Sequence, residues 1–332
     1  MNQKLIKKLI LGLIMLFMTA LTLVSSTFAW FSQNREVWTD EFDIEIENSD
    51  SLLISVDGVN FRNSIPNDLL KKAIVSKKIN KPINELTDKE VVDEYKNILL
   101  QPITTNDLST FSHIGENSSI QNGYYTLVEA DHNSYLSFDL WFKVAASRTA
   151  TLEYNLKFVS DDYASEFGTL VSYINCLTSE VVLHNQLNTV DNLYQSNETI
   201  YVNARDAVRI GVIHNENLKT IYEPYIGLGS YALKDDINDI YNPEKNAMLT
   251  YFNNTHEGKL EPLENLDIYK NTQKDFNGGI SFGKIVPNGD NTDYLPVKIT
   301  VYIWLEGYDA DYILGISNTN LKMMLNFCVE EV

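Results

Sequence analysis

The sequence predicts an all-β protein: one antiparallel β-sandwich domain with helical and long-loop insertions, preceded by an N-terminal hydrophobic signal helix. Several segments alternate apolar and polar residues with the period of two that is typical of half-buried strands. Turn-forming Asn, Asp and Gly residues separate these segments. The alternation of strand and helix that marks parallel sheets is missing, so antiparallel pairing is expected.

The first 29 residues predict an export signal. Lys4, Lys7 and Lys8 precede an apolar run over residues 9–24, and small residues follow up to Ala29. This order is typical of a secretory signal peptide, with cleavage between Ala29 and Trp30. The alternative is an uncleaved membrane anchor, because the apolar region extends to about residue 31, roughly the 20 residues that a bilayer requires. The folded domain is expected over residues 30–332.

Charge restricts the partners of this domain. The formal net charge is −19, and loss of the three signal lysines takes it to −22. Such an excess of acid argues against nucleic acids and anionic lipids as partners and favours solubility outside the cell. The two cysteines, Cys176 and Cys328, either form a disulfide worth about 4–5 kcal/mol or remain two separate buried thiols.

The N-terminal third of this domain predicts two strands and then helices. Residues 41–47 alternate apolar and acidic side chains, and residues 52–56 form a second strand that ends at Asp57-Gly58, a turn signal. Residues 66–100 are helix-like, and Thr87 with Glu90 forms a capping box ahead of an apolar helical face. A helical insertion of about 66–100 is therefore predicted between strands.

The strongest strand signals follow. Residues 135–144 and 149–159 both alternate, and the four residues between them predict an antiparallel hairpin. A shorter strand is predicted around residues 208–212, and residues 214–295 are expected to be mainly long loops. Two last strands alternate over residues 297–305 and 321–329, and Cys328 falls on the face opposite Leu325 and Phe327.

No motif indicates an enzyme. His256-Glu257 begins a zinc-protease pattern, but Leu260 stands where the second histidine ligand must fall. A serine-nucleophile elbow is missing, and neither cysteine has a catalytic context. A pair of carboxylates brought together in space stays open as an alternative.

Two kinds of ligand site are candidates. Glu306, Asp309 and Asp311 place three carboxylates in a predicted strand-exit turn, where oxygen ligands suit Ca²⁺; the alternative is a solvated surface turn. Trp141 and Trp304 fall on the less apolar faces of their strands. Exposed there, they favour carbohydrate or partner binding; the alternative is a cover of loops or of the helical insertion.

The junction Thr27-Phe28-Ala29-Trp30-Phe31-Ser32, with the strand that follows at residues 42–46, resembles exported Gram-positive proteins processed by a SipW-type signal peptidase. The best-known group is the TasA/camelysin family of biofilm-matrix fibre proteins. The resemblance implies a jelly-roll sandwich and polymerisation, in which the freed N-terminal strand is donated to the next subunit. Trp30, Phe31, Phe42, Ile44 and Ile46 would belong to the donated segment.

The function predicted on these grounds is that of a structural protein of the cell surface or extracellular matrix, acting through self-assembly or with other matrix or surface proteins. Its other expected partner is the signal peptidase during export. The alternative is an extracellular binding module for carbohydrate or for a cell-wall or host ligand. No cofactor is expected beyond the candidate Ca²⁺.

Overall fold

The computed structural model describes most of the predicted sandwich. The described residues are 37–46, 52–105, 107–115, 117–145, 150, 152–158, 173–174, 179–182, 199–202, 207–214, 218–222, 258, 280–307 and 319–332. The chain divides into two compact units, residues 1–35 and 36–332, and all described residues belong to the second. The predicted signal, residues 1–29, lies outside them. No helix among the described residues has the length and apolar character needed to span a membrane.

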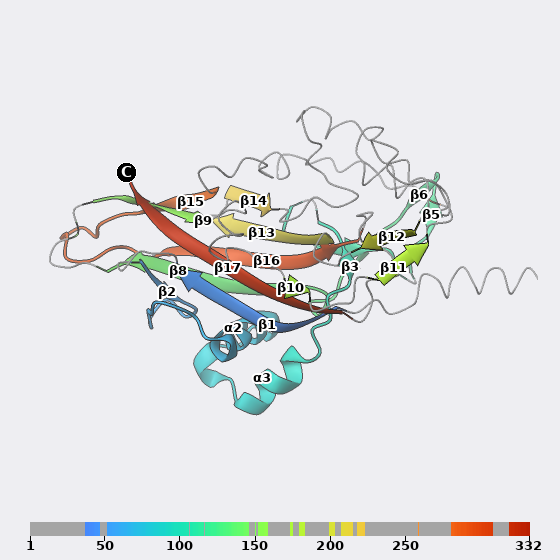
Figure 1. Cartoon of the computed structure of the whole chain (residues 1–332), viewed down its shortest axis with the longest axis horizontal. Helices are drawn as coiled ribbons and strands as arrows, with labels where there is room; N and C mark the ends of the chain where they lie inside the picture. Colours follow the sequence, from blue (N-terminus) through green and yellow to red (C-terminus); the bar gives the residue numbers. More distant parts are fainter. Residues whose placement is uncertain are drawn as a thin grey trace, which may run out of the picture. The chain divides into compact units, whose positions relative to one another are not determined.

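Two sheets form the framework (Figure 1). Sheet A has the strand order β1 (Val37–Ile46), β17 (Thr319–Glu331), β9 (Tyr154–Phe158) and β15 (Ile280–Ile285), with β10 (Tyr173–Ile174) also beside β17. Sheet B has the order β14 (Leu218–Tyr222), β13 (Val208–His214), β16 (Val297–Glu306), β8 (Leu136–Val144) and β2 (Leu52–Ser55), with β3 (Pro102–Ile103) also beside β16. Three two-stranded sheets pair β4 (Ser112–His113) with β7 (Val128–Glu129), β5 (Ile120–Gln121) with β6 (Tyr124–Tyr125), and β11 (Ser179–Val182) with β12 (Thr199–Val202).

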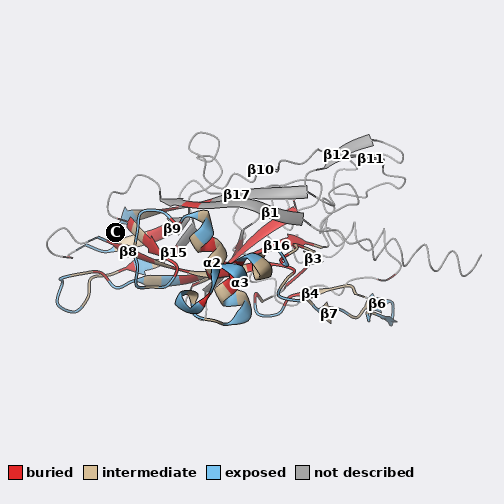
Figure 2. Cartoon of the chain, turned by 90° about the horizontal axis from the view of Figure 1, so that it is seen from below, coloured by how far each residue is buried: buried red, intermediate tan, exposed pale blue. Residues whose placement is uncertain are grey.

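The main core lies between sheets A and B (Figure 2). Along β8, every second residue from Leu136 to Val144 is buried, as the alternating sequence predicts. The Phe142 ring from sheet B lies 4.7 Å from the Phe327 ring of sheet A, centroid to centroid. The all-β prediction is therefore confirmed, and the two sheets pack face to face.

Strand direction departs from a purely antiparallel arrangement in two places. Among the described strands, most pairs are antiparallel, but β1 runs parallel to β17 and β3 runs parallel to β16. A parallel neighbour cannot be joined by a tight turn. In β1 and β17, the two strands come from opposite ends of the described chain.

The hairpin predicted for residues 135–159 is wrong. β8 pairs with β16 and β2 in sheet B, whereas β9 pairs with β17 and β15 in sheet A. Both strands carry a buried face, including Leu140 in β8 and Leu156 in β9, and both faces belong to the main core. The two strands therefore bury their apolar residues from opposite sheets.

The predicted helical segment contains α2 (Asn67–Ile79), the short 3₁₀ helix η1 (Ile83–Glu85) and α3 (Asp88–Tyr95). Leu70, Ala73 and Ile74 of α2 belong to the main core. The predicted capping box is present, with both hydrogen bonds made between Thr87 and Glu90. Lysines in α2 and just after it form ion pairs with acids of α3: the pairs are Lys72–Asp88, Lys78–Glu94 and Lys81–Glu90, at 2.7–3.0 Å.

Candidate assembly strand

β1 contains the described part of the predicted donor segment, and it forms an edge of sheet A. Figure 1 shows β1 (blue) alongside β17 (red). The register places Phe42 opposite Met323, Ile44 opposite Leu325 and Ile46 opposite Phe327, with an irregularity between Thr39 and Phe42. The main-chain ladder to β17 therefore holds β1 along its length.

Ile44 anchors β1 in the core. Its side chain is 1% exposed and packs in the cluster that includes Leu325 and Phe327. Burial of an isoleucine side chain is worth about 1.5–3 kcal/mol. For Phe42 and Ile46, the structure describes the backbone pairing, which puts them on the same face of β1 as Ile44. The predicted donor residues Trp30 and Phe31 and the cleavage residue Ala29 lie outside the described residues.

The other edge of β1 meets a segment that the sequence did not indicate. The Ile65 N–H donates to the Ile44 carbonyl at 3.4 Å. Just before it, Arg62 and Ile54 of β2 exchange two backbone hydrogen bonds, at 2.8 and 2.9 Å. Residues 62–65 therefore run from the edge of sheet B to the edge of sheet A. Only Asn63 and Ser64 separate Arg62 from Ile65, and so short a stretch carries no alternation by which the sequence could have identified it.

A short connection joins β1 to the remainder of the domain. Residues 47–51, which lie outside the described residues, lead from β1 in sheet A to β2 in sheet B. Packed sheets are separated by about 10 Å, and five extended residues span at most about 17 Å. β1 is thus attached at its C-terminal end by a segment of five residues.

Trp304 is not an exposed ligand-binding residue. It is completely buried, on the face of sheet B that points away from the main core, in a second cluster with Leu108 and Phe111. Its indole Nε1 donates to Glu306 Oε2 at 3.2 Å. Residues that precede β8 in the chain, among them Leu108 and Phe111, therefore cover Trp304, and of the alternatives that the sequence left open the cover of loops is the one found.

Trp141 lies further along the outer face of sheet B and is half-buried. Its indole packs against Gly58, whose φ of +73° belongs to the predicted Asp57-Gly58 turn. Lys298 Nζ lies 5.0 Å from the Trp141 ring centroid and 2.8 Å from Asp139 Oδ2. Trp141 thus keeps an exposed portion beside a charged group.

Asp139 organises the charges around Trp141, a role that the sequence did not indicate. Its carboxylate accepts from Thr300 Oγ1 at 2.7 Å and pairs with Lys77 Nζ at 2.9 Å as well as with Lys298. Burial acts to raise the pKa of Asp139, but hydrogen bonds from Lys298, Thr300 and Lys77 outweigh it and lower that pKa. The carboxylate is therefore held in its charged form.

Glu306 does not lie in an exposed calcium-binding turn. It is completely buried at the end of β16 and accepts the Trp304 hydrogen bond described above. Arg209 of β13 lies opposite Trp304 in the strand register, so it is diagonal to Glu306 on the same face of sheet B. Arg209 is also completely buried. Asp309 and Asp311 lie outside the described residues, so the complete calcium set is not tested. Within the described part of the chain, no group of three His, Cys, Asp or Glu residues could hold a metal ion.

Cys328 lies in β17 and is half-buried, on the strand face opposite the buried Leu325 and Phe327, as alternation predicts. Cys176 lies outside the described residues, so the predicted Cys176–Cys328 disulfide stays a prediction. The chain matches no protein-family model, no curated protein and no solved structure.

Proposed function

We propose that this chain is a secreted structural protein of the cell surface or extracellular matrix, which assembles into fibres by donating β1 to the next copy. The observation that carries the proposal is the position of β1. It is an N-terminal edge strand, paired with β17 through the main chain, anchored by buried Ile44 and attached by five residues. A strand of this kind can leave its own domain and pair in the same way with another copy.

Strand exchange would conserve the native contacts. The donated β1 would make the same ladder to β17 and put Ile44 into the same position of the core in a second copy. Exchange of an identical element is therefore a low-cost route to assembly, and a head-to-tail contact that does not close on itself gives a filament.

The proposal includes the export route and the finer fold that the resemblance implies. A SipW-type signal peptidase would cut between Ala29 and Trp30 and free the segment ahead of β1, and the sandwich would have jelly-roll topology. An uncut signal would instead tether the chain to the membrane. No catalytic residue is assigned.

Deletion of residues 30–47 from the mature chain tests strand donation. We expect loss of fibres in electron microscopy, and we expect an added synthetic peptide of residues 30–47 to bind and restore a folded, monomeric complex. A shortened chain that still forms fibres would exclude β1 as the donor.

A second candidate function is binding of a carbohydrate or of a cell-wall or host ligand. The half-exposed Trp141 beside Lys298 favours it, since an aromatic ring next to a cation can hold a polar ligand. Trp141→Ala should abolish a glycan-array signal of the folded protein; a signal that survives the substitution would exclude this residue.

A further inference from the structure

The direction of β1 determines where a donor copy must lie on its acceptor. β1 and β17 run parallel from the pair Val37–Thr319 to the pair Ile46–Phe327. The arrows of both strands point to the left in Figure 1, toward the end marked C. A chain that enters as β1 therefore leaves the acceptor beside the last residues of β17.

The donor cannot move far from this point. After Ile46, residues 47–51 lead directly into the donor's own β2, which belongs to sheet B of the donor. Five residues span at most about 17 Å even when fully extended. The folded body of the donor must then rest against this end of the acceptor.

This end of the sandwich carries three exposed apolar side chains on neighbouring chain segments: Leu152, Leu295 and Val332, which are 42%, 51% and 63% exposed. The Val332 N–H donates to the Glu153 carbonyl at 3.0 Å, which places Val332 beside the start of β9. The Leu295 N–H donates to the Val286 carbonyl at 2.9 Å, directly after Ile285, which pairs with Tyr154 of β9. The three residues, termed here the end patch, therefore lie across adjacent segments.

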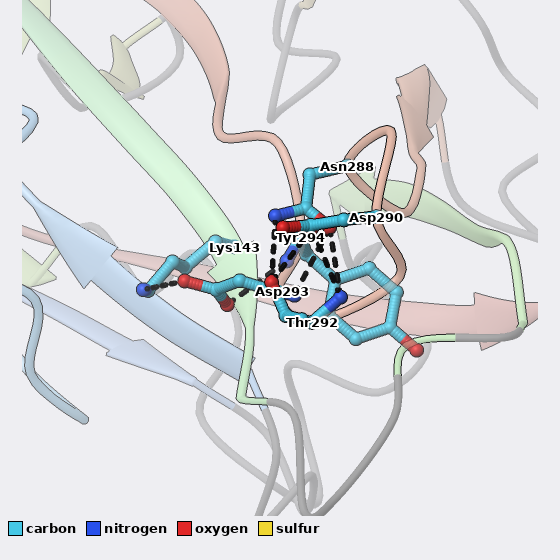
Figure 3. Close-up of polar contacts among 6 residues, drawn as sticks. All are labelled: Lys143, Asn288, Asp290, Thr292, Asp293 and Tyr294. Carbon is cyan, nitrogen blue, oxygen red and sulfur yellow. Dashed lines mark hydrogen bonds and ion pairs between the residues drawn. The ribbon is translucent and has the colours of Figure 1, made fainter.

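The loop that presents Leu295 is held by its own hydrogen bonds (Figure 3). The Asn288 side-chain oxygen accepts from the backbone N–H groups of Thr292 and Asp293 at 2.9 and 3.1 Å. Lys143 Nζ from β8 binds Asp293 Oδ2 at 3.1 Å and ties the loop to sheet B. A surface that is already ordered loses less conformational entropy when a partner binds.

Charged pairs border the end patch. Lys284 Nζ lies 3.1 Å from Oε2 of Glu153, the residue after Leu152, and Lys143 pairs with Asp293, two residues before Leu295. An apolar centre with a polar rim is the usual anatomy of a protein–protein contact. We infer that the end patch is the surface against which the body of the donor copy packs in the fibre, an inference that rests on the proposed strand donation.

The test compares two associations: that of mature chains, residues 30–332, with one another, and that of the synthetic peptide 30–47 with a chain that lacks residues 30–47. The double substitution Leu152→Lys and Leu295→Lys alters exposed positions only, so the monomer should keep its circular dichroism spectrum and melting temperature. We expect subunit association, measured by sedimentation, to weaken at least about tenfold because two apolar contacts are lost. Binding of the synthetic peptide 30–47 to the chain that lacks residues 30–47 should change by less than about twofold on the same double substitution, because the peptide brings strand β1 without a body.

Val92→Lys is the matched control, because Val92 is 64% exposed on α3 and undergoes the same chemical change. It should leave both associations unaltered. If the end-patch variant associates like the unsubstituted chain while excess peptide still blocks fibre growth, the end patch is excluded and strand donation stands. If the peptide does not bind the chain that lacks residues 30–47, strand donation fails and the end patch fails with it.

Discussion

The contact between Gly283 and His214 shows how one residue type can be required for packing. Gly283 of β15 has a φ of +129°, in the region that glycine adopts and other residues avoid, at an irregularity of the β15–β9 pairing. A Cβ atom at this position would overlap the His214 imidazole ring. The alternation of β13 puts His214 on the same face as Ile210 and Val212, which belong to the main core.

Gly283→Ala is therefore expected to lower the free energy of unfolding by about 2–4 kcal/mol, through backbone strain together with the clash. Urea denaturation measures this loss. Gly289→Ala is the control, since a Cβ atom there meets nothing within 4 Å. Equal stability of the two variants would contradict the packing argument.

The lowered pKa of His214 predicts that the folded chain loses stability in weak acid. Burial lowers its pKa below the ordinary value of 6.5, and a hydrogen bond with the Lys298 backbone opposes this shift in part. As the pH falls, the unfolded chain therefore takes up a proton at this histidine before the folded chain does. The stability that the folded chain gains from a neutral His214 is fully present above pH 6.5 and declines as the pH falls below that value.

Denaturant midpoints at neutral pH and in weak acid measure this dependence. Burial lowers the pKa of His113 as well, so the two histidines act in the same direction. His214→Gln should reduce the pH dependence of the midpoint, leaving the part that His113 contributes. An identical pH profile in the variant would remove His214 from this account.

At the level of elements, the capping box of α3 was visible in the sequence and allows a quantitative expectation. The Glu90 N–H donates to Thr87 Oγ1 at 3.2 Å, and the Thr87 N–H donates to Glu90 Oε2 at 2.9 Å. Thr87→Ala should cost about 1 kcal/mol. Faster hydrogen exchange of the α3 amides would report it. Asp93→Ala, which removes an exposed pair with Lys96, should cost less than about 0.5 kcal/mol.

Alternation predicted most long strands and their buried faces, but not their partners. The inward faces of β8, β13 and β16 follow directly from the period of two. The same pattern fits a strand in either sheet, so chain proximity suggested the wrong partner for β9. β14 and β15 fell inside a region predicted as loops, because Gly283 and frequent Asn and Asp residues obscure their patterns.

For the candidate assembly strand too, the sequence predicted the strand and its buried face but not its neighbours. The acidic and apolar alternation around Ile44 predicted a half-buried strand, and the structure places Ile44 in the core. What covers Trp304 and Glu306 could not be derived, because alternation identifies the outer face and says nothing of Leu108 and Phe111, nearly 200 residues earlier in the chain.

At the level of the whole molecule, net charge should govern assembly. Copies with a formal charge of −19, or −22 without the signal, repel one another. Fibre growth should accelerate between about 0.01 M and 1 M salt, where the screening length falls from about 30 Å to 3 Å. Light scattering follows the growth. Slower growth at high salt would indicate that ion pairs between copies drive assembly, contrary to the apolar contact inferred here.

The parallel pairing of β1 with β17 also governs when the sandwich can close. β1 leaves the ribosome early, whereas β17 follows only after nearly all of the remaining chain. Contacts this distant in sequence form slowly, and an unpaired strand edge stays exposed meanwhile. β1 therefore stays unpaired until a β17 strand becomes available to it. Under the proposed strand donation, a low local concentration of chains favours pairing of β1 with its own β17, which gives the monomer. A high local concentration favours pairing with the β17 of a neighbouring chain, which gives the fibre.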